Sequence, residues 1–146
     1  MKSSAKHPAS SDFNAGGRGY PDVSAIGHRC FITTSGRLGS VDGTSCSAPI
    51  FAGIVANLNE YQMSKGRPLL GYANPLWYKM SQEQPSTFKD ITQGSNDQTE
   101  ALNCNNFNLG YEATTGWDAV TGLGTPNVEE MRKYLDSKFA EKVNSS

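Results

Sequence analysis

The longest regular pattern in this sequence predicts a helix over residues 45–64 and constrains how that helix can pack. Apolar side chains recur there at three- and four-residue spacing, which gathers them on one helical face: Ile50, Phe51, Ile54, Val55, Leu58 and Tyr61. Several other positions are small, as in a helix pressed closely against neighbouring elements: Ala48, Ala52, Gly53 and Ala56. Pro49 suits a first turn, whose amides lack intrahelical partners, so the helix is expected to begin close to Ser45.

Shorter elements are expected on both sides of this helix. Strands or extended pieces are predicted over three stretches upstream of it: residues 20–27, 28–34 and 36–43. Downstream, a short helix is expected around residues 75–80 with Asn74 as its cap, and a last helix from just after Pro126 to about residue 143. Residues 81–122 are rich in Asn, Gln, Gly and Thr and are expected to be mostly irregular.

Composition excludes several classes of function. The formal net charge is -1, and the basic residues are scattered, which argues against nucleic acid as a partner. No apolar run approaches the roughly 20 residues needed to cross a bilayer, and the polar start lacks the apolar stretch of a secretory signal. The three cysteines form no C-x-x-C pair, so a zinc or redox site is not expected. In a secreted protein their odd number would leave one thiol free or paired outside this chain.

The sharpest chemical feature is Gly-Thr-Ser-Cys-Ser-Ala-Pro over residues 43–49. A serine hydroxyl attacks only when a base takes its proton and donors stabilise the oxyanion, and a helix N-terminus offers free amides to Ser45. The alternative is an ordinary Ser/Thr helix cap. A cysteine nucleophile at Cys46 would need a paired histidine, and only His7 and His28 exist. Cys46 is therefore interpreted as a small buried residue, and both histidines as structural or surface groups.

This motif resembles the nucleophile motif of the sedolisins, the serine-carboxyl peptidases that include tripeptidyl peptidase I, and it is also similar to the subtilisin motif. The stretch over residues 10–25 and Gly-Trp-Asp-x-x-Thr-Gly-x-Gly-x-Pro over residues 116–126 resemble sedolisins as well, and subtilisins lack the second signature. The resemblance implies an α/β fold, the C-terminal portion of a subtilisin-like parallel sheet flanked by helices. It divides the chain into a polar segment, a peptidase portion and a tail: residues 1–15, 16–140 and 141–146.

The resemblance also implies one structural calcium ion. By composition alone, Asp90 and Asp118 would be ordinary turn residues. In sedolisins, however, the corresponding positions bind calcium through carboxylates and backbone carbonyls, which are the oxygen ligands calcium prefers. The implied ligands are the Asp90 carboxylate, the Ile91 carbonyl, the Gly116 carbonyl and the Asp118 carboxylate. Thr114, where relatives often have glycine, would add a further carbonyl.

The function implied is peptide-bond hydrolysis at acidic pH, by an endopeptidase or a tripeptidyl peptidase with Ser45 as nucleophile. Its Glu and Asp partners would lie N-terminal to the matched segment, so the isolated chain is expected to be inactive; Asp22 and Asp42 match no catalytic position. Implied partners are peptide or protein substrates, the N-terminal half of the catalytic domain and a propeptide, in an extracellular or lysosome-like acidic compartment. Nucleic acid and membrane are not expected as partners. The alternatives are a catalytically inactive calcium-binding remnant that binds peptides or proteins, and a subtilisin-like peptidase with an upstream histidine.

Overall fold

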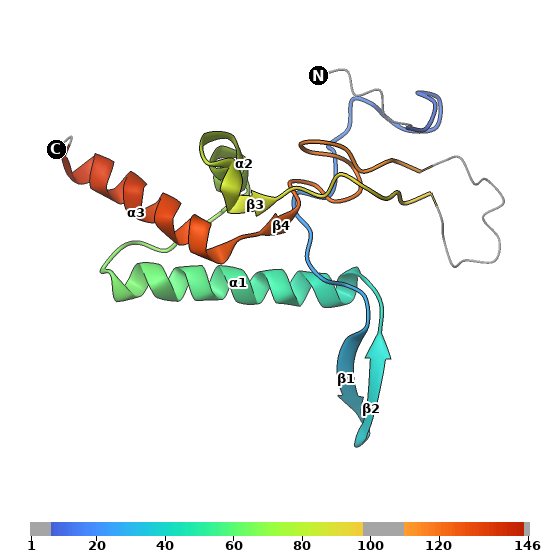
Figure 1. The fold of residues 1–146 in the computed structure, drawn as a ribbon, viewed down its shortest axis with the longest axis horizontal. Coiled ribbons are helices and arrows are strands. Elements are labelled where there is room, and N and C mark those ends of the chain that lie inside the picture. The colour runs from blue at the N-terminus through green and yellow to red at the C-terminus, as the bar shows by residue number, and fades with distance from the viewer. Residues whose placement is uncertain (1–6, 98–109, 145–146) are drawn as a thin grey trace. The chain divides into compact units, whose positions relative to one another are not determined.

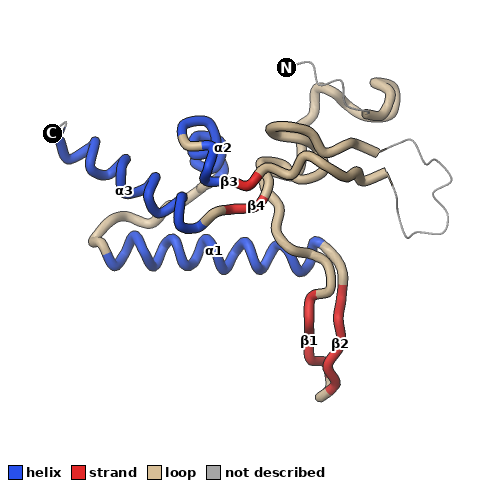
Figure 2. The backbone as a smooth tube through the Cα atoms, viewed as in Figure 1, coloured by secondary structure: helices blue, strands red, loops and turns tan. Residues whose placement is uncertain are grey.

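The computed structural model describes residues 7–97 and 110–144, so Cys104 lies outside the described residues. The chain divides into two compact units, which we call the loop unit (Met1–Val23 and Lys89–Thr125) and the helical unit (Ser24–Phe88 and Pro126–Ser146). The regular elements are shown in Figures 1 and 2. In chain order they are β1 (Cys30–Thr34), β2 (Arg37–Val41), α1 (Thr44–Ser64), α2 (Asn74–Glu83), the 3-10 helix η1 (Pro85–Thr87), β3 (Phe88–Lys89), β4 (Thr125–Pro126) and α3 (Val128–Asn144).

Strands β1 and β2 form an antiparallel hairpin whose register runs from Cys30 opposite Val41 to Thr34 opposite Arg37. The two-residue turn between them has positive φ at Ser35 (52°) and Gly36 (74°), as the tight turn of a twisted hairpin requires. The expected strand over 28–34 and the extended piece over 36–43 are thus confirmed. In Figure 1 the hairpin extends from the N-terminal end of α1.

The strand expected over residues 20–27 is wrong, because no strand forms there. The backbone of this stretch instead makes isolated hydrogen bonds. One of them, in the loop unit, runs from the Leu123 amide to the Asp22 carbonyl at 2.9 Å. The parallel sheet stays a prediction. Among the described residues both sheets have only two strands, β1 with β2 and β3 with β4, and the first pair is antiparallel.

Helix α1 confirms the expected element and begins one residue before Ser45. The expected burial of its apolar face is only partly confirmed. Leu58 and Gln62 are its buried residues, whereas Ile50 is 42% exposed. The small residues of its first four turns also lie exposed: Ala48, Ala52, Gly53 and Ala56. Helix α3 lies against the C-terminal half of α1, and Phe51 in the N-terminal half packs edge-to-face on Trp77 of α2, with ring centroids 5.8 Å apart. Thr44, Ser45 and residues 48–50 stay exposed.

The core of the helical unit lies where α1, α2, η1 and α3 meet. Its buried apolar side chains are Leu58, Ala73, Trp77, Met80, Phe88, Met131, Tyr134 and Leu135. Helix α2 confirms the short helix expected around residues 75–80, but Ala73 and not Asn74 is its cap. The Trp77 amide donates to the Ala73 carbonyl (3.1 Å), which starts the helix one residue earlier than expected. None of the helices within the described residues is long and apolar enough to cross a membrane.

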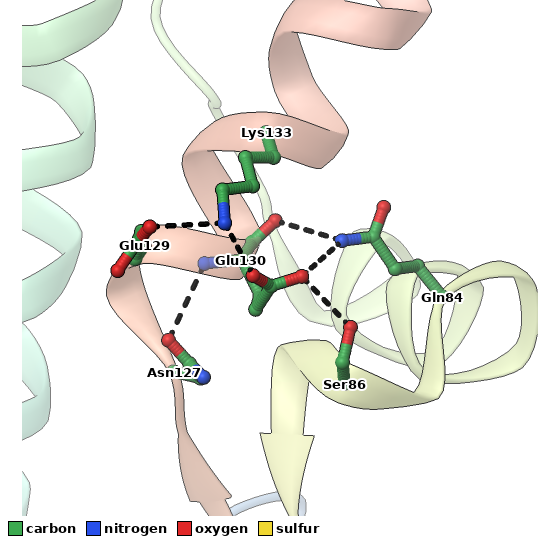
Figure 3. Close-up of polar contacts among 6 residues, drawn as sticks. All are labelled: Gln84, Ser86, Asn127, Glu129, Glu130 and Lys133. Carbon is green, nitrogen blue, oxygen red and sulfur yellow. Dashed lines mark hydrogen bonds and ion pairs between the residues drawn. The ribbon is translucent and has the colours of Figure 1, made fainter.

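A polar cluster fastens the start of α3 to the segment after α2 (Figure 3). The Glu130 carboxylate accepts hydrogen bonds from Gln84 Nε2 (2.9 Å), Ser86 Oγ (2.9 Å) and Lys133 Nζ (2.8 Å). The Glu130 amide donates to Asn127 Oδ1 at 3.3 Å. These contacts, led by the one to Lys133, lower the pKa of the Glu130 carboxyl. The charge that holds the helix start in place is therefore retained at mildly acidic pH.

A second carboxylate joins α3 to the end of α1. Asp136 accepts hydrogen bonds from Arg67 Nη1 (2.5 Å) and the Tyr61 hydroxyl (2.8 Å). Arg67, ahead of Tyr61, lowers the pKa of the Asp136 carboxyl below its ordinary value. A carboxyl whose pKa is lowered in the folded state stabilises the fold above its unfolded pKa, and this contribution is lost as pH falls through the folded pKa.

Replacing Asp136 with asparagine is expected to make the stability of the chain less sensitive to acid. The parent should lose stability between pH 6 and pH 3, because the Asp136 carboxyl takes up a proton more readily in the unfolded chain, where Arg67 does not lower its pKa. Urea midpoints at the two pH values measure the effect, with Glu60→Gln, an exposed carboxyl on α1, as the matched control. An Asp136→Asn variant whose midpoint falls as steeply as that of the parent would contradict the assignment.

Candidate functional site

Ser45 lies exposed in the first turn of α1, directly after the cap residue Gly43 and Thr44. Gly43 has a φ of 148°, a conformation that favours glycine, and it has no side chain with which to cap the helix. No side-chain cap hydrogen bond forms at this end. The alternative of an ordinary Ser/Thr cap therefore does not describe this turn, and the Ser45 side chain lies on the surface at the N-terminal end of the helix.

The backbone before the hairpin lies tightly against this turn. The Gly43 amide donates to the Gly27 carbonyl at 2.7 Å, and the Cys46 amide donates to the Gly43 carbonyl at 3.0 Å. A Cβ atom at Gly27 would meet Ser47 Oγ at 2.5 Å and the Gly43 oxygen at 3.0 Å. Glycine at position 27 is thus what allows the two segments to approach each other.

A disulfide joins Cys46 to Cys30, with a Cα–Cα distance of 6.6 Å. The interpretation of Cys46 as a small buried residue is therefore wrong: it is half-buried and covalently bound to the first residue of β1. The sequence carried little signal for this bond, because the two cysteines are 16 positions apart and share no motif. Cys30 and Cys46 come together only because strand β2 returns the chain from the hairpin turn to the start of α1.

The two histidines are exposed, as expected for surface groups. His28 Nδ1 lies 3.0 Å from Asp42 Oδ1, and the same oxygen accepts a hydrogen bond from the Arg29 amide. Asp42 thus holds the start of the hairpin to the segment just before α1. His7 lies in the loop unit, where its Nδ1 is 2.7 Å from the Pro8 carbonyl.

Replacing Gly27 with alanine is expected to destabilise the chain by about 1–3 kcal/mol, because the added methyl group overpacks the contact with the helix start. Gly53→Ala is the matched control. Position 53 lies in the middle of α1, and a Cβ added there would meet no atom within 4 Å, so alanine should stabilise the helix by about 0.5–1 kcal/mol. Chemical unfolding of both variants measures the difference. Equal stability of the two would show that the segment does not approach the helix start closely.

Asp118 is the most constrained of the predicted metal-ligating residues. It is 6% exposed, and its Oδ2 accepts a hydrogen bond from the Thr114 amide at 2.8 Å. Its Oδ1 accepts from the Val120 amide (3.0 Å), the Thr121 amide (2.8 Å) and the Thr121 hydroxyl (3.2 Å). The carboxylate is therefore the centre around which residues 114–121 fold, a role that the sequence motif did not reveal.

Asp90, which follows β3 in the sequence, binds the same loop over residues 114–121. Its Oδ2 accepts a hydrogen bond from the Gly116 amide at 2.8 Å. Asp90 and Gly116 are exposed, and Ile91 is half-buried. Within the described residues no three His, Cys, Asp or Glu side chains gather as a metal site. Two carboxylates, one in the glycine-containing loop 114–121 and one bound to it from the segment after β3, fit the oxygen chemistry of calcium when backbone carbonyls supply most of the ligands.

Trp117 packs within the loop unit. Its Nε1 donates to the Pro21 carbonyl at 2.8 Å, and a Cβ atom at Gly19 would meet the indole ring at 2.6 Å. The ring is 39% exposed and borders a cavity of about 630 Å³ that is lined by residues of this unit. Its contacts pack the loop over residues 114–121 against the stretch around Pro21.

No protein-family model matches the chain. Comparison with characterised proteins gives long matches instead. Physarolisin from Physarum polycephalum is 48% identical over 137 residues, which is 94% of this chain and 23% of physarolisin. Tripeptidyl-peptidase 1 from Rattus norvegicus is 40% identical over 136 residues, 92% of this chain and 23% of the rat protein. The chain belongs to the sedolisin family.

A solved sedolisin agrees with this assignment. The structure of Pseudomonas sedolisin, a serine-carboxyl proteinase complexed with two molecules of pseudo-iodotyrostatin, matches 70% of this chain and 24% of its own, with a TM-score of 0.56 and 31% identity. The chain thus spans under a quarter of the length of these sedolisins and corresponds to their C-terminal portion. Its described helices and hairpin are part of a subtilisin-like fold.

Proposed function

We propose that this chain supplies the nucleophile of a serine-type peptidase, either an endopeptidase or a tripeptidyl peptidase, that cleaves peptide bonds at acidic pH. The observation that supports the proposal is the exposed Ser45 in the first turn of α1, in a chain that belongs to the sedolisin family. Ser45 Oγ would attack the carbonyl carbon of the scissile bond. Its proton would pass to a glutamate carboxylate, partnered by an aspartate, in the portion of the catalytic domain upstream of this chain.

Two features of the chain suit that chemistry. The amides of the first turn of α1 and the dipole of the helix favour the negative charge that develops when Ser45 attacks. A carboxylate base works near its own pKa, which sets an acidic working range. Hydrogen bonds lower the pKa of three carboxyls that hold α3: Glu83 through Tyr134, Glu130 through Lys133, and Asp136 through Arg67. Their contribution to stability is therefore present at mildly acidic pH and is lost only as the pH falls further.

We also propose one structural calcium ion in the loop unit. The Asp90 and Asp118 carboxylates and the Ile91 and Gly116 carbonyls would hold it, with Thr114 as a further carbonyl. What supports the site is that both carboxylates already bind amides of the loop 114–121, at Gly116 and Thr114. The ion would link the segment after β3 to this loop, and no step of peptide hydrolysis would pass through it.

The partners follow from the same proposal. The exposed small residues on the N-terminal half of α1 suit a closely packed neighbour, and we propose that the upstream half of the catalytic domain covers them. The other proposed partners are a propeptide and peptide or protein substrates. The site of action would be the extracellular space or a lysosome-like acidic compartment.

A chimaera tests the proposal directly. This chain replaces the matching 137 residues of physarolisin, to which it is 48% identical, and hydrolysis of an unstructured protein is measured at mildly acidic pH. We expect a folded chimaera to cleave the substrate. A folded chimaera with no activity would contradict the proposal and favour an inactive calcium-binding chain.

A further inference from the structure

The start of α1 is held in an unusual way for a helix that carries a proposed nucleophile. The first amides of a helix have no intrahelical partner, and a side-chain cap normally keeps the first turn from fraying. Gly43 cannot supply such a cap, and no side-chain cap bond forms. Thr44 and Ser45 are exposed, and the contact of α1 with the buried Trp77 is made by Phe51, almost two turns further along the helix. The described core of the helical unit therefore does not hold the first turn in place.

A covalent bond takes the place of the cap. Cys46, the residue after Ser45, is joined to Cys30 at the start of β1. Cys30 pairs with Val41 across the hairpin, so the disulfide closes a ring that contains the hairpin and the helix start. A hydrogen bond from the Gly43 amide to the Gly27 carbonyl (2.7 Å) also joins the segment before the hairpin to the helix start.

We infer that the Cys30–Cys46 disulfide positions Ser45 for attack on the peptide carbonyl. The inference rests on the proposed function, because it assigns two positioning residues to that reaction. A nucleophile displaced by about 1 Å can lose about 100-fold in rate, so a turn that frays by one residue is enough to matter. The disulfide fixes the backbone one residue from the attacking oxygen and ties it to the first residue pair of the hairpin ladder, Cys30 with Val41.

The structural part of the inference is tested on the 146-residue chain itself. Amide hydrogen exchange is measured by NMR for the parent and for the double variant Cys30→Ser/Cys46→Ser. We expect the Gly43 and Cys46 amides to exchange at least about tenfold faster in the variant, because local opening at an uncapped helix end is then unrestrained. Leu58, buried in the same helix, is the internal control and should be unchanged. Equal protection of Gly43 and Cys46 in both proteins would overturn the inference.

The catalytic part is tested in the chimaera with physarolisin. The double variant should show a kcat about ten- to a hundredfold lower per folded molecule, with KM and the pH profile unchanged, because binding and the acid groups are intact. Dithiothreitol should slow the parent and leave the double variant unaffected, which separates this disulfide from other thiols. Full kcat in the reduced parent and in the variant would overturn the inference. Inactivity of the chimaera with the disulfide intact would instead count against the proposed function.

Discussion

Replacing Ser45 with alanine in the active chimaera should lower kcat by roughly 10⁴- to 10⁶-fold, with KM little changed. The change removes the attacking oxygen and leaves binding groups and the oxyanion donors in place. Ser45 is exposed, so the substitution creates no cavity and should not alter the stability of the fold. Steady-state kinetics on an unstructured protein substrate at mildly acidic pH measures the loss.

Ser47→Ala is the matched control, because Ser47 lies in the same turn and has no assigned catalytic role. It should keep activity within about threefold, as is usual for a change outside the reacting groups. The isolated 146-residue chain should not cleave the substrate at all, since the proposed carboxylates lie upstream. Turnover by the isolated chain that disappears in the Ser45→Ala variant would show that this prediction is wrong.

Replacing Asp118 with alanine should destabilise the loop unit by about 2–5 kcal/mol, because a buried carboxylate that satisfies four donors is removed. The Thr114, Val120 and Thr121 amides would lose their acceptor. Thermal and urea unfolding of the 146-residue chain measures the effect. Asp12→Asn, an exposed carboxyl of the same unit, is the control and should change stability by less than about 0.5 kcal/mol.

Measuring stability with and without calcium separates the proposed metal site from the loss of hydrogen bonds in the Asp118→Ala variant. At about 100 times its dissociation constant, one bound ion should stabilise the parent by about 2.7 kcal/mol relative to the chelated protein. Asp118→Asn keeps the shape of the side chain and removes its charge, so the calcium-dependent part of the stability should shrink or vanish. A parent whose unfolding does not respond to calcium would contradict the site, even if Asp118→Ala is severely destabilised.

Local patterns in the sequence were sufficient for the three α-helices and the hairpin, although they also predicted a strand over residues 20–27 that does not form. The apolar spacing over residues 45–64 and the proline at position 49 predicted α1, and the last helix after Pro126 was equally clear. The hairpin followed from a short run of strand-forming residues before a glycine turn. These features depend on residues within a few positions of one another, so they can be derived without knowing the rest of the fold. The family signature after residue 116 was likewise visible in the sequence.

Contacts between distant residues were decided only by the tertiary structure. The bond between Cys30 and Cys46, the four donors around Asp118 and the exposure of Ser45 all depend on which segments meet in space. Helical periodicity tells which side chains share a face but not what covers that face, and cysteine spacing does not fix pairing. The sequence alone thus determined the α-helices, the hairpin and the chemical motifs, whereas the fold determined how the turn that carries Ser45 is held.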